Sequence, residues 1–501
     1  MKSLLWLLLA AGGGVLWALC FERQPFLLAP WVALAPLFLL LLLPPRRAAA
    51  LGFVHGFASW MTALSWIAST LVTYGGLPKA ASVPLLAILA AYLALYHAAF
   101  AGLGARLWRR GGGLALWGLP ALWVALEWLR TYLGGGFPWN LAAYAWVGVP
   151  GALPLAAWIG AYGVSFLVLT ANAGVAMAVA RRRWEPLAAG LALPLLLLPL
   201  GGRWSTRQGA EMVAPAPFAG TPVRLLQPNI QNLTRFEAAA VYRNYRKVLD
   251  LSTAACEEGT LVIWPESAAW PFSFERDADF ARDLAGQVRR GCTVLFNSTH
   301  EVGGFVYNSA FLLSPGAPPA RYDKRHLVPF GEYVPFRGVF SFIDKLAREA
   351  GEFRSGEGVH LLPWGDERIG MSICYEVVFP DEVAALVRAG ATVLVTITND
   401  AWYGDTAAPW QHFRAARFRA AENRRPLLRA AITGVSALIA PDGSVAAEID
   451  LFREGVIRAR VAGRSRLTPF ARHPRRVPAL CSFLAAFAII WTFRKPPGSP
   501  P

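Results

Sequence analysis

The sequence predicts a two-part protein, in which a bundle of about eight membrane-spanning helices is joined to an α/β sandwich domain outside the bilayer. Two observations predict this combination. Hydrophobic residues make up 55% of the 501 positions and charged residues only 16%, which is too apolar for an ordinary soluble protein. The polar residues are concentrated between positions 203 and 476, a stretch long enough to bury a large core of its own.

Apolar stretches of about 20 residues, the length that crosses a bilayer as a helix, mark the membrane part. They lie at 3–21, 26–44, 50–73, 82–105, 114–132, 152–180, 185–201 and 477–493. We therefore expect a transmembrane domain over 1–202, a polar domain over 203–476, and a final span with a short tail over 477–501.

The net charge of +16 is explained better by membrane topology than by nucleic-acid binding, because of where the basic residues lie. Basic clusters at 46–47, 106–110, 181–183 and 494–495 each adjoin an apolar stretch. If the N-terminus is cytoplasmic, all of these clusters fall on the cytoplasmic side, as the positive-inside rule requires. Both termini are then predicted to be cytoplasmic and the polar domain to face outward, and no nucleic-acid partner is expected.

Short apolar and β-branched runs that end in polar, glycine or proline residues predict the strands of the polar domain. These runs are VRLLQPNI, TLVIWPES, CTVLFNST, SAFLLSP, RIGMSICYE and ATVLVTITND. Helices are expected at 236–258, 276–290, 380–389 and 407–425, with hairpin-like insertions at 303–314 and 435–449. This largely alternating order of strands and helices predicts an α/β sandwich.

Reactive side chains stand at the ends of several predicted strands. Glu266 ends LVIWPE, Cys374 ends RIGMSIC, and Asn399 follows TVLVTIT. Because the carboxyl ends of such strands gather at one rim, we expect these residues to converge there, with Lys324 arriving from a loop after the hairpin strands.

A glutamate, a lysine and a cysteine form a coherent catalytic set. A thiol is a weak nucleophile at neutral pH until a base or a nearby positive charge produces the thiolate. Glu266 is expected to take the proton of Cys374. Lys324 is expected to stabilise the thiolate and the oxyanion of a tetrahedral intermediate, with a backbone N–H near Tyr375 as a second donor. Attack on an acyl compound then gives a thioester.

The remaining cysteines show no CxxC spacing and no accompanying histidine cluster, so neither a metal site nor a redox pair is indicated. Cys20 and Cys481 lie in apolar stretches and are expected to be buried. The sequence leaves open whether Cys256 and Cys292 form a disulfide. No cofactor and no metal are expected.

The reactive segments resemble the nitrilase, or carbon-nitrogen hydrolase, superfamily: WPES carries the glutamate, YDK the lysine and SICYE the cysteine. With the apolar spans around them, nearly the whole chain resembles the apolipoprotein N-acyltransferase family. Further matching segments are LVPFGEYVP, TNDAWYGDTAAPWQH, RAAENRRPLLRA and TGVSALIAPDG. The resemblance implies a nitrilase-like αββα sandwich on the periplasmic side of a bacterial inner membrane.

The resemblance also implies a ping-pong acyl transfer. Cys374 would remove a fatty acyl chain from a membrane phospholipid, and the α-amino group of an N-terminal S-diacylglyceryl-cysteine of an apolipoprotein would then take it. The implied partners are the phospholipid donor, the diacylglyceryl apolipoprotein acceptor and the lipid bilayer, and a monomer is expected.

Supporting residues follow from the same resemblance. Glu332 matches a second glutamate that helps to hold Lys324, while Tyr375 and Glu376 match neighbours of the cysteine that are important to activity. Substrate or lipid contacts are expected from Phe236, Phe336, Phe340, Phe342, Asn399, Trp402 and Trp139. One departure is Arg235-Phe236, where the family often has a Lys-Trp pair. The apolar segment 334–346 is expected to form a lid over an acyl-chain entrance.

Two other functions are compatible with the same residues. A membrane-tethered amidase or nitrilase would use the three catalytic residues to hydrolyse a small amide or nitrile. A scaffold protein would carry the domain without catalysis. The apolar spans and the 334–346 segment favour a lipid donor over a small amide, and the complete catalytic set argues against a scaffold.

Overall fold

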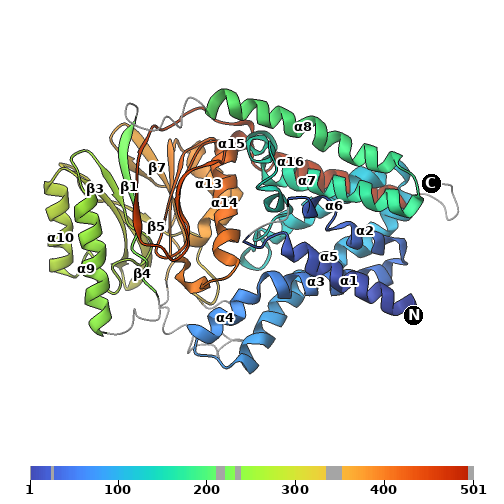
Figure 1. Cartoon of the computed structure of the whole chain (residues 1–501), viewed down its shortest axis with the longest axis horizontal. Helices are drawn as coiled ribbons and strands as arrows, with labels where there is room; N and C mark the ends of the chain where they lie inside the picture. The colour runs from blue at the N-terminus through green and yellow to red at the C-terminus, as the bar shows by residue number, and fades with distance from the viewer. Residues whose placement is uncertain (1, 24–26, 210–219, 232–237, 334–352, 495–501) are drawn as a thin grey trace. The chain divides into compact units, whose positions relative to one another are not determined.

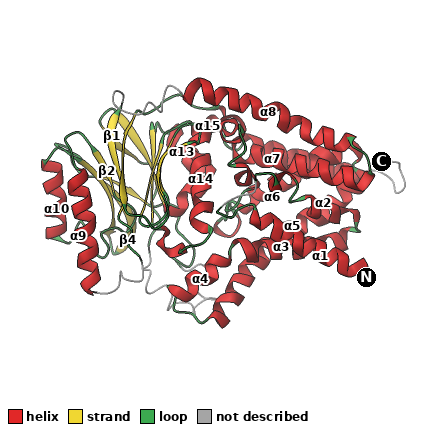
Figure 2. Cartoon of the chain, in the orientation of Figure 1, coloured by secondary structure: helices red, strands yellow, loops and turns green. Residues whose placement is uncertain are grey.

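The computed structural model describes residues 2–23, 27–209, 220–231, 238–333 and 353–494. These residues divide into two compact units, each described here by itself. Unit 1 comprises Met1–Thr206, Thr406–Arg414 and His473–Pro501, and unit 2 comprises Arg207–Asp405 and Ala415–Arg472. Unit 1 is helical, whereas the strands belong to unit 2 (Figures 1 and 2).

Long apolar runs form the helices of the first unit, because a helix satisfies its backbone hydrogen bonds within one segment. In chain order they are α1 (Lys2–Leu19), α2 (Ala35–Leu39), α3 (Pro45–Ala63), α4 (Ser65–Thr73), α5 (Lys79–Arg110), α6 (Ala115–Arg130), α7 (Ala152–Arg181), α8 (Glu185–Gly209) and α16 (Arg476–Arg494). Helix α7 is the most deeply buried of the span-length helices in the described ranges.

The expected number of about eight spans is not confirmed. Within the described residues, five helices are long and apolar enough to cross a membrane, at Lys79–Arg110, Gly112–Arg130, Ala152–Arg181, Glu185–Arg203 and Arg476–Phe493. The predicted 50–73 span is divided into α3 and α4, because Leu64 between them has a non-helical backbone. The described part of the 26–44 stretch forms α2 and two short 3₁₀ helices, and prolines lie near the starts of α2 and of the first 3₁₀ helix.

Unit 2 is built on two sheets of six described strands each. The first has the order β12-β1-β2-β3-β4-β5 and the second the order β11-β10-β9-β8-β7-β6. The strands of the first sheet are β1 (Thr221–Gln227), β2 (Leu261–Ile263), β3 (Thr293–Val302), β4 (Phe305–Leu313), β5 (Ala320–Asp323) and β12 (Gly455–Val461). Those of the second are β6 (Leu361–Trp364), β7 (Glu367–Ile373), β8 (Val393–Thr398), β9 (Leu427–Ala431), β10 (Ser436–Ile439) and β11 (Val445–Ile449).

The two sheets pack face to face around an apolar core. Leu225 and Ile263 of the first sheet share one buried cluster with Met371 and Ile397 of the second. Strands β1, β2 and β3 are parallel to one another, as are β7, β8 and β9, so each sheet has a parallel centre whose strands end at the same edge. The predicted reactive residues follow these strands and lie at the shared edges.

Helices cover the outer faces of the sheets. Helices α9 (Ala238–Ala255) and α10 (Ala278–Arg289) pack on the first sheet through Val248, Phe280 and Leu284. Helix α13 (Pro380–Arg388) lies on the outer side of the second sheet, and α15 (Pro469–Arg472) packs against it (Figure 1). Helix α14 (Ala408–Asn423) begins in unit 1 and ends in unit 2. This layering confirms the predicted α/β sandwich.

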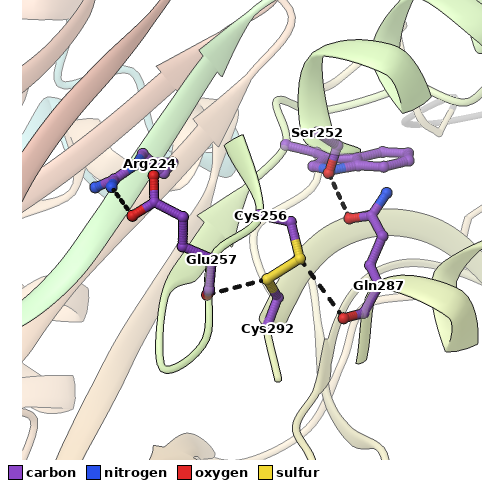
Figure 3. Close-up of a disulfide and its surroundings, with 7 residues drawn as sticks. Arg224, Ser252, Cys256, Glu257, Gln287 and Cys292 are labelled. Carbon is purple, nitrogen blue, oxygen red and sulfur yellow. Dashed lines mark hydrogen bonds and ion pairs between the residues drawn. A yellow bond between two sulfur atoms is a disulfide. The ribbon is translucent and has the colours of Figure 1, made fainter. Parts of the chain in front are cut away.

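A disulfide answers the question that the sequence left open. Cys256, directly after α9, is bonded to Cys292, directly before β3, with 5.8 Å between their Cα atoms (Figure 3). The bond therefore ties the end of α9 to the start of a central strand. Beside it, Ser252 donates a hydrogen bond to Gln287 at 2.6 Å, which joins α9 to α10.

Candidate active site

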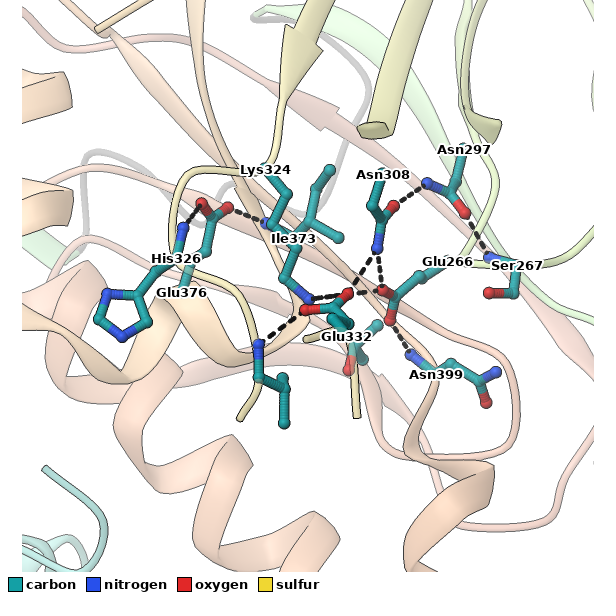
Figure 4. Close-up of polar contacts among 12 residues, drawn as sticks. Glu266, Ser267, Asn297, Asn308, Lys324, His326, Glu332, Ile373, Glu376 and Asn399 are labelled. Carbon is teal, nitrogen blue, oxygen red and sulfur yellow. Dashed lines mark hydrogen bonds and ion pairs between the residues drawn. The ribbon is translucent and has the colours of Figure 1, made fainter. Parts of the chain in front are cut away.

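The predicted reactive residues lie at the ends of their strands and meet at one edge of the sandwich. Lys324 directly follows β5, Cys374 directly follows β7, and Glu266 and Asn399 follow β2 and β8. Hydrogen bonds and ion pairs join three of these residues into one group (Figure 4). The predicted convergence is therefore present in the structure, while the catalytic roles remain a proposal.

Lys324 is the buried cation of the site. Its ammonium nitrogen lies 2.8 Å from Glu332 Oε1 and 3.8 Å from Glu266 Oε1, and its side chain is only 1% exposed. Burial by itself lowers the pKa of Lys324, but the charges of Glu332 and Glu266 outweigh burial and raise the pKa above its ordinary value. Lys324 is therefore positively charged at neutral pH.

Glu266 is held by donors on both carboxylate oxygens. Asn308 Nδ2 donates to Oε1 at 3.1 Å, and the backbone N–H of Asn399 donates to Oε2 at 2.9 Å. Asn308 also donates to Glu332 Oε1 at 2.9 Å, so one amide group orients both carboxylates around Lys324. These two donors fix the direction in which the Glu266 carboxylate points, as a base that must reach one particular proton requires.

Cys374 has an unusual backbone for a residue with a side chain. Its φ of +54° lies in the left-handed region, which costs about 1 kcal/mol or more outside glycine. The residue begins the 3₁₀ helix η8 (Cys374–Val378) at the sharp turn after β7, and it is 8% exposed. The turn places Cys374 at the end of its strand, where the charges of Glu266 and Lys324 influence the pKa of its thiol.

The thiol of Cys374 is protonated at rest. Burial raises its pKa most, the negative charge of Glu266 raises it further, and the positive charge of Lys324 lowers it by less than these two raise it. A thiol with a raised pKa does not ionise spontaneously at neutral pH. A thiol of this kind attacks a carbonyl carbon only with the help of a base that takes its proton as the sulfur bonds to carbon.

Glu376 connects the cysteine turn to the lysine loop. It accepts hydrogen bonds from the backbone N–H of Ile373 at 2.7 Å and of Arg325 at 2.7 Å, and from the Tyr322 hydroxyl at 2.9 Å. Ile373 precedes Cys374 and Arg325 follows Lys324. Glu376 thus fixes the two reactive residues relative to each other, which gives the predicted supporting residue a structural role.

The other predicted residues differ in what the structure shows. Tyr375 is buried, with its ring edge-on to Phe379 at 5.2 Å. Trp402 is half-buried in η9 (Asp400–Tyr403). Trp139 belongs to unit 1, where its side chain is buried rather than presented on a surface and its indole N–H donates to Gln411 Oε1 at 2.7 Å. The lipid-contact residues Phe236, Phe336, Phe340 and Phe342, and the 334–346 segment, lie outside the described residues.

Sequence reasoning missed the two asparagines behind the carboxylates. Asn297 in β3 donates to Asn308 Oδ1 in β4 at 2.7 Å and accepts from the Ser267 backbone N–H at 2.8 Å, so Asn308 is held in place to serve Glu266 and Glu332. The sequence signal that could have identified Asn308 is an amide side chain inside the mostly apolar strand β4. Within the described ranges, no group of three or more His, Cys, Asp or Glu residues is arranged to hold a metal ion.

Comparison with known proteins defines the class first. Residues 223–470 match the carbon-nitrogen hydrolase family model, and residues 13–174 match the model of the apolipoprotein N-acyltransferase N-terminal domain. Among solved structures, an amidase of the nitrilase superfamily from Nesterenkonia AN1 is similar with a TM-score of 0.40 and 22% identity, over 54% of this chain and 100% of that one.

Full-length relatives then define the family. The apolipoprotein N-acyltransferase of Geobacter metallireducens is 39% identical over 91% of this chain and 89% of its own length. Those of Ralstonia nicotianae and Photobacterium profundum are 34% and 32% identical, each over 93% of this chain and over 89% and 90% of their own lengths. The chain belongs to the apolipoprotein N-acyltransferase family.

Proposed function

We propose that the protein transfers a fatty acyl chain from a membrane phospholipid to the N-terminus of an apolipoprotein. The observation that carries the proposal is the Glu266–Lys324 pair acting on the Cys374 thiol at one sheet edge, in a chain of this family that also has span-length apolar helices. The site supplies a nucleophile, a base and a fixed positive charge, which are the requirements of acyl transfer through a thioester.

In the first half-reaction, Glu266 takes the thiol proton while the Cys374 sulfur attacks the ester carbonyl carbon of the phospholipid. A C–S bond forms, and the negative charge of the tetrahedral oxyanion is stabilised by Lys324. Collapse of this intermediate breaks the bond between the carbonyl carbon and the glycerol oxygen. The proton on Glu266 passes to that oxygen, and lysophospholipid leaves the acyl-enzyme behind.

In the second half-reaction, the α-amino group of an N-terminal S-diacylglyceryl-cysteine attacks the thioester carbonyl. Glu266 takes the amine proton, the C–S bond breaks, and the proton returns to the Cys374 sulfur. An amide is formed and the free thiol is restored. The burial of Lys324 and Cys374 limits the access of water, so that the acyl group reaches the amine before it is hydrolysed.

The function is tested by incubating purified protein with phospholipid labelled in one acyl chain and with a synthetic diacylglyceryl-cysteine peptide. Labelled N-acyl peptide and one equivalent of lysophospholipid per transfer are expected. Release of labelled free fatty acid with no acylated peptide would support hydrolysis instead, the chemistry expected of a membrane-tethered amidase.

The location of the catalytic unit is part of the proposal. We infer that domain 203–476 faces the periplasm of a bacterial inner membrane, that about eight spans at 1–202 and 477–493 anchor it, and that both termini are cytoplasmic. The Cys256–Cys292 disulfide supports this orientation, because such bonds persist in oxidising compartments outside the cytosol. A monomer is consistent with anchoring of each chain by its own helices.

The disulfide gives the orientation a direct test. Non-reducing digestion of protein isolated from membranes is expected to yield a linked Cys256–Cys292 peptide. Replacing both cysteines with alanine should lower the stability of the domain by about 2–4 kcal/mol, because the bond closes a loop across a sequence separation of 36 residues. Full recovery of both residues as free thiols from freshly alkylated cells would contradict a periplasmic location.

A further inference from the structure

A second carboxylate acts on Cys374 and has no part in the proposed reaction. Asp400 follows Asn399 at the end of β8 and is 1% exposed. Its negative charge, like that of Glu266, raises the pKa of the Cys374 thiol. A carboxylate here without a cation beside it would add a second negative charge to the site.

An arginine from the next strand forms an ion pair with this carboxylate. Arg429 of β9 donates from Nη2 to Asp400 Oδ2 at 2.6 Å, and both side chains are fully buried. The other oxygen, Oδ1, accepts from the Thr398 hydroxyl at 2.8 Å. Arg429 is itself held by a bond from Nε to the Val435 carbonyl at 3.0 Å. The charge of Asp400 is therefore neutralised by a fixed partner.

Close backbone packing leaves little freedom to this ion pair. A Cβ atom on Gly434 would come within 2.3 Å of Asp400 Oδ2, so the carboxylate fits only against a glycine. Arg429 pairs in register with Thr396 of β8, the strand that ends just before Asn399. The backbone N–H of Asn399 is the donor that holds Glu266 Oε2 at 2.9 Å. The ion pair thus anchors the peptide that positions the base.

We propose that Arg429 and Asp400 form a positioning pair that assigns the role of base to Glu266. Arg429 offsets the charge of Asp400 through their 2.6 Å ion pair, and the anchored Asp400 holds the neighbouring Asn399 N–H against Glu266. This inference rests on the proposed function for the role of Cys374 as nucleophile. The pair acts through Asn399 and Glu266 rather than on the reacting atoms, so both members are positioning residues rather than catalytic ones.

The charged and titratable groups near the Cys374 thiol determine how a substitution of Arg429 or Asp400 changes the charge of the site. Glu266 faces it from the end of β2, Lys324 from the end of β5, and Asp400 and Tyr403 from the turn after β8. Tyr403 is half-buried, and the burial of its hydroxyl raises the pKa well above the ordinary value and keeps the group neutral. Loss of Arg429 therefore makes the site more negative by one charge, whereas loss of the Asp400 charge makes it more positive by one.

The test compares the pH dependence of Cys374 alkylation by iodoacetamide in the full-length protein with Cys20→Ala and Cys481→Ala in the background. Arg429→Met is expected to shift the profile to higher pH, lowering the rate at a fixed pH by about tenfold or more, because each pKa unit changes the thiolate fraction tenfold. Asp400→Asn should shift the profile to lower pH by a similar amount. The double variant, and Arg429→Lys, should return it close to that of the parent.

A merely structural role for the pair predicts a different pattern. Shifts of both single variants in the same direction, or no shift in either, would overturn the proposal. If Arg429→Met does not fold, the nearly isosteric Asp400→Asn variant still tests the proposal. Only a shift of its alkylation profile to lower pH supports the proposed role of the pair. Alkylation needs no lipid. A parent protein that forms no acyl-enzyme would therefore refute the proposed function while leaving this test of the pair intact.

Discussion

Replacing Cys374 with alanine is expected to abolish the acyl-enzyme and to lower the rate of peptide acylation by a factor on the order of 10⁴ to 10⁶. The substitution removes the atom that carries the acyl chain between donor and acceptor, and no other described thiol lies beside Glu266 and Lys324. The measurement is the initial rate of N-acylation of a diacylglyceryl-cysteine peptide, with the melting temperature recorded to show that the protein is folded.

A second buried cysteine provides the matched control for this substitution. Cys481 lies in α16, in unit 1, and its replacement by alanine removes the same atoms without touching the site. We expect Cys481→Ala to keep at least about half of the parent activity, since small changes of buried volume cost little. Substantial acylation by Cys374→Ala would mean that transfer proceeds without a covalent intermediate on this residue.

Replacing Lys324 with methionine is expected to slow acyl-enzyme formation by about 10²–10³-fold, the usual cost of losing one oxyanion-stabilising group. Glu266 and Glu332 would then share a buried site without their cation, which should also cost about 3–5 kcal/mol of stability. Because the lysine charge lowers the pKa of Cys374, its loss should move thiol alkylation to higher pH. Single-turnover kinetics and chemical unfolding measure these effects.

An exposed lysine in the same unit serves as the control. Lys247 pairs with Glu454 at 2.5 Å on the surface, with both side chains at least one-third exposed. Lys247→Met should change stability by less than about 1 kcal/mol and leave the rate unchanged, because exposed ion pairs contribute little. Equal losses in the two variants would show that the effect of Lys324 is not specific to the site.

Much of the catalytic edge could be predicted because strand ends are readable in the sequence. Glu266, Cys374 and Asn399 each follow an apolar run, and parallel strands bring such positions to one edge. Asn308 could not be placed in this way. It lies inside β4, and its contact with Glu266 depends on the register of the antiparallel β3–β4 pair, which places Asn297 opposite Ala310 and diagonally across from Asn308. Registers of this kind are set by tertiary packing rather than by local pattern.

The membrane part shows a similar division between what composition determines and what packing determines. Hydropathy identifies the long apolar segments, and helices α5, α6, α7, α8 and α16 follow them. The backbone break at Leu64 between α3 and α4 has no proline or glycine to mark it. Trp139 likewise donates its indole N–H to Gln411, far away in the chain, and no local pattern indicates that contact.

The most direct test of the account is the intact mass of the peptide that contains Cys374 after the purified protein has been exposed to phospholipid without an acceptor. We predict a mass increase equal to one fatty acyl chain, sensitive to neutral hydroxylamine and matched by an equal amount of lysophospholipid. The modification should be absent from Cys374→Ala and should disappear when a diacylglyceryl-cysteine peptide is added. An unmodified Cys374 in a preparation that still acylates the peptide would contradict the thioester mechanism.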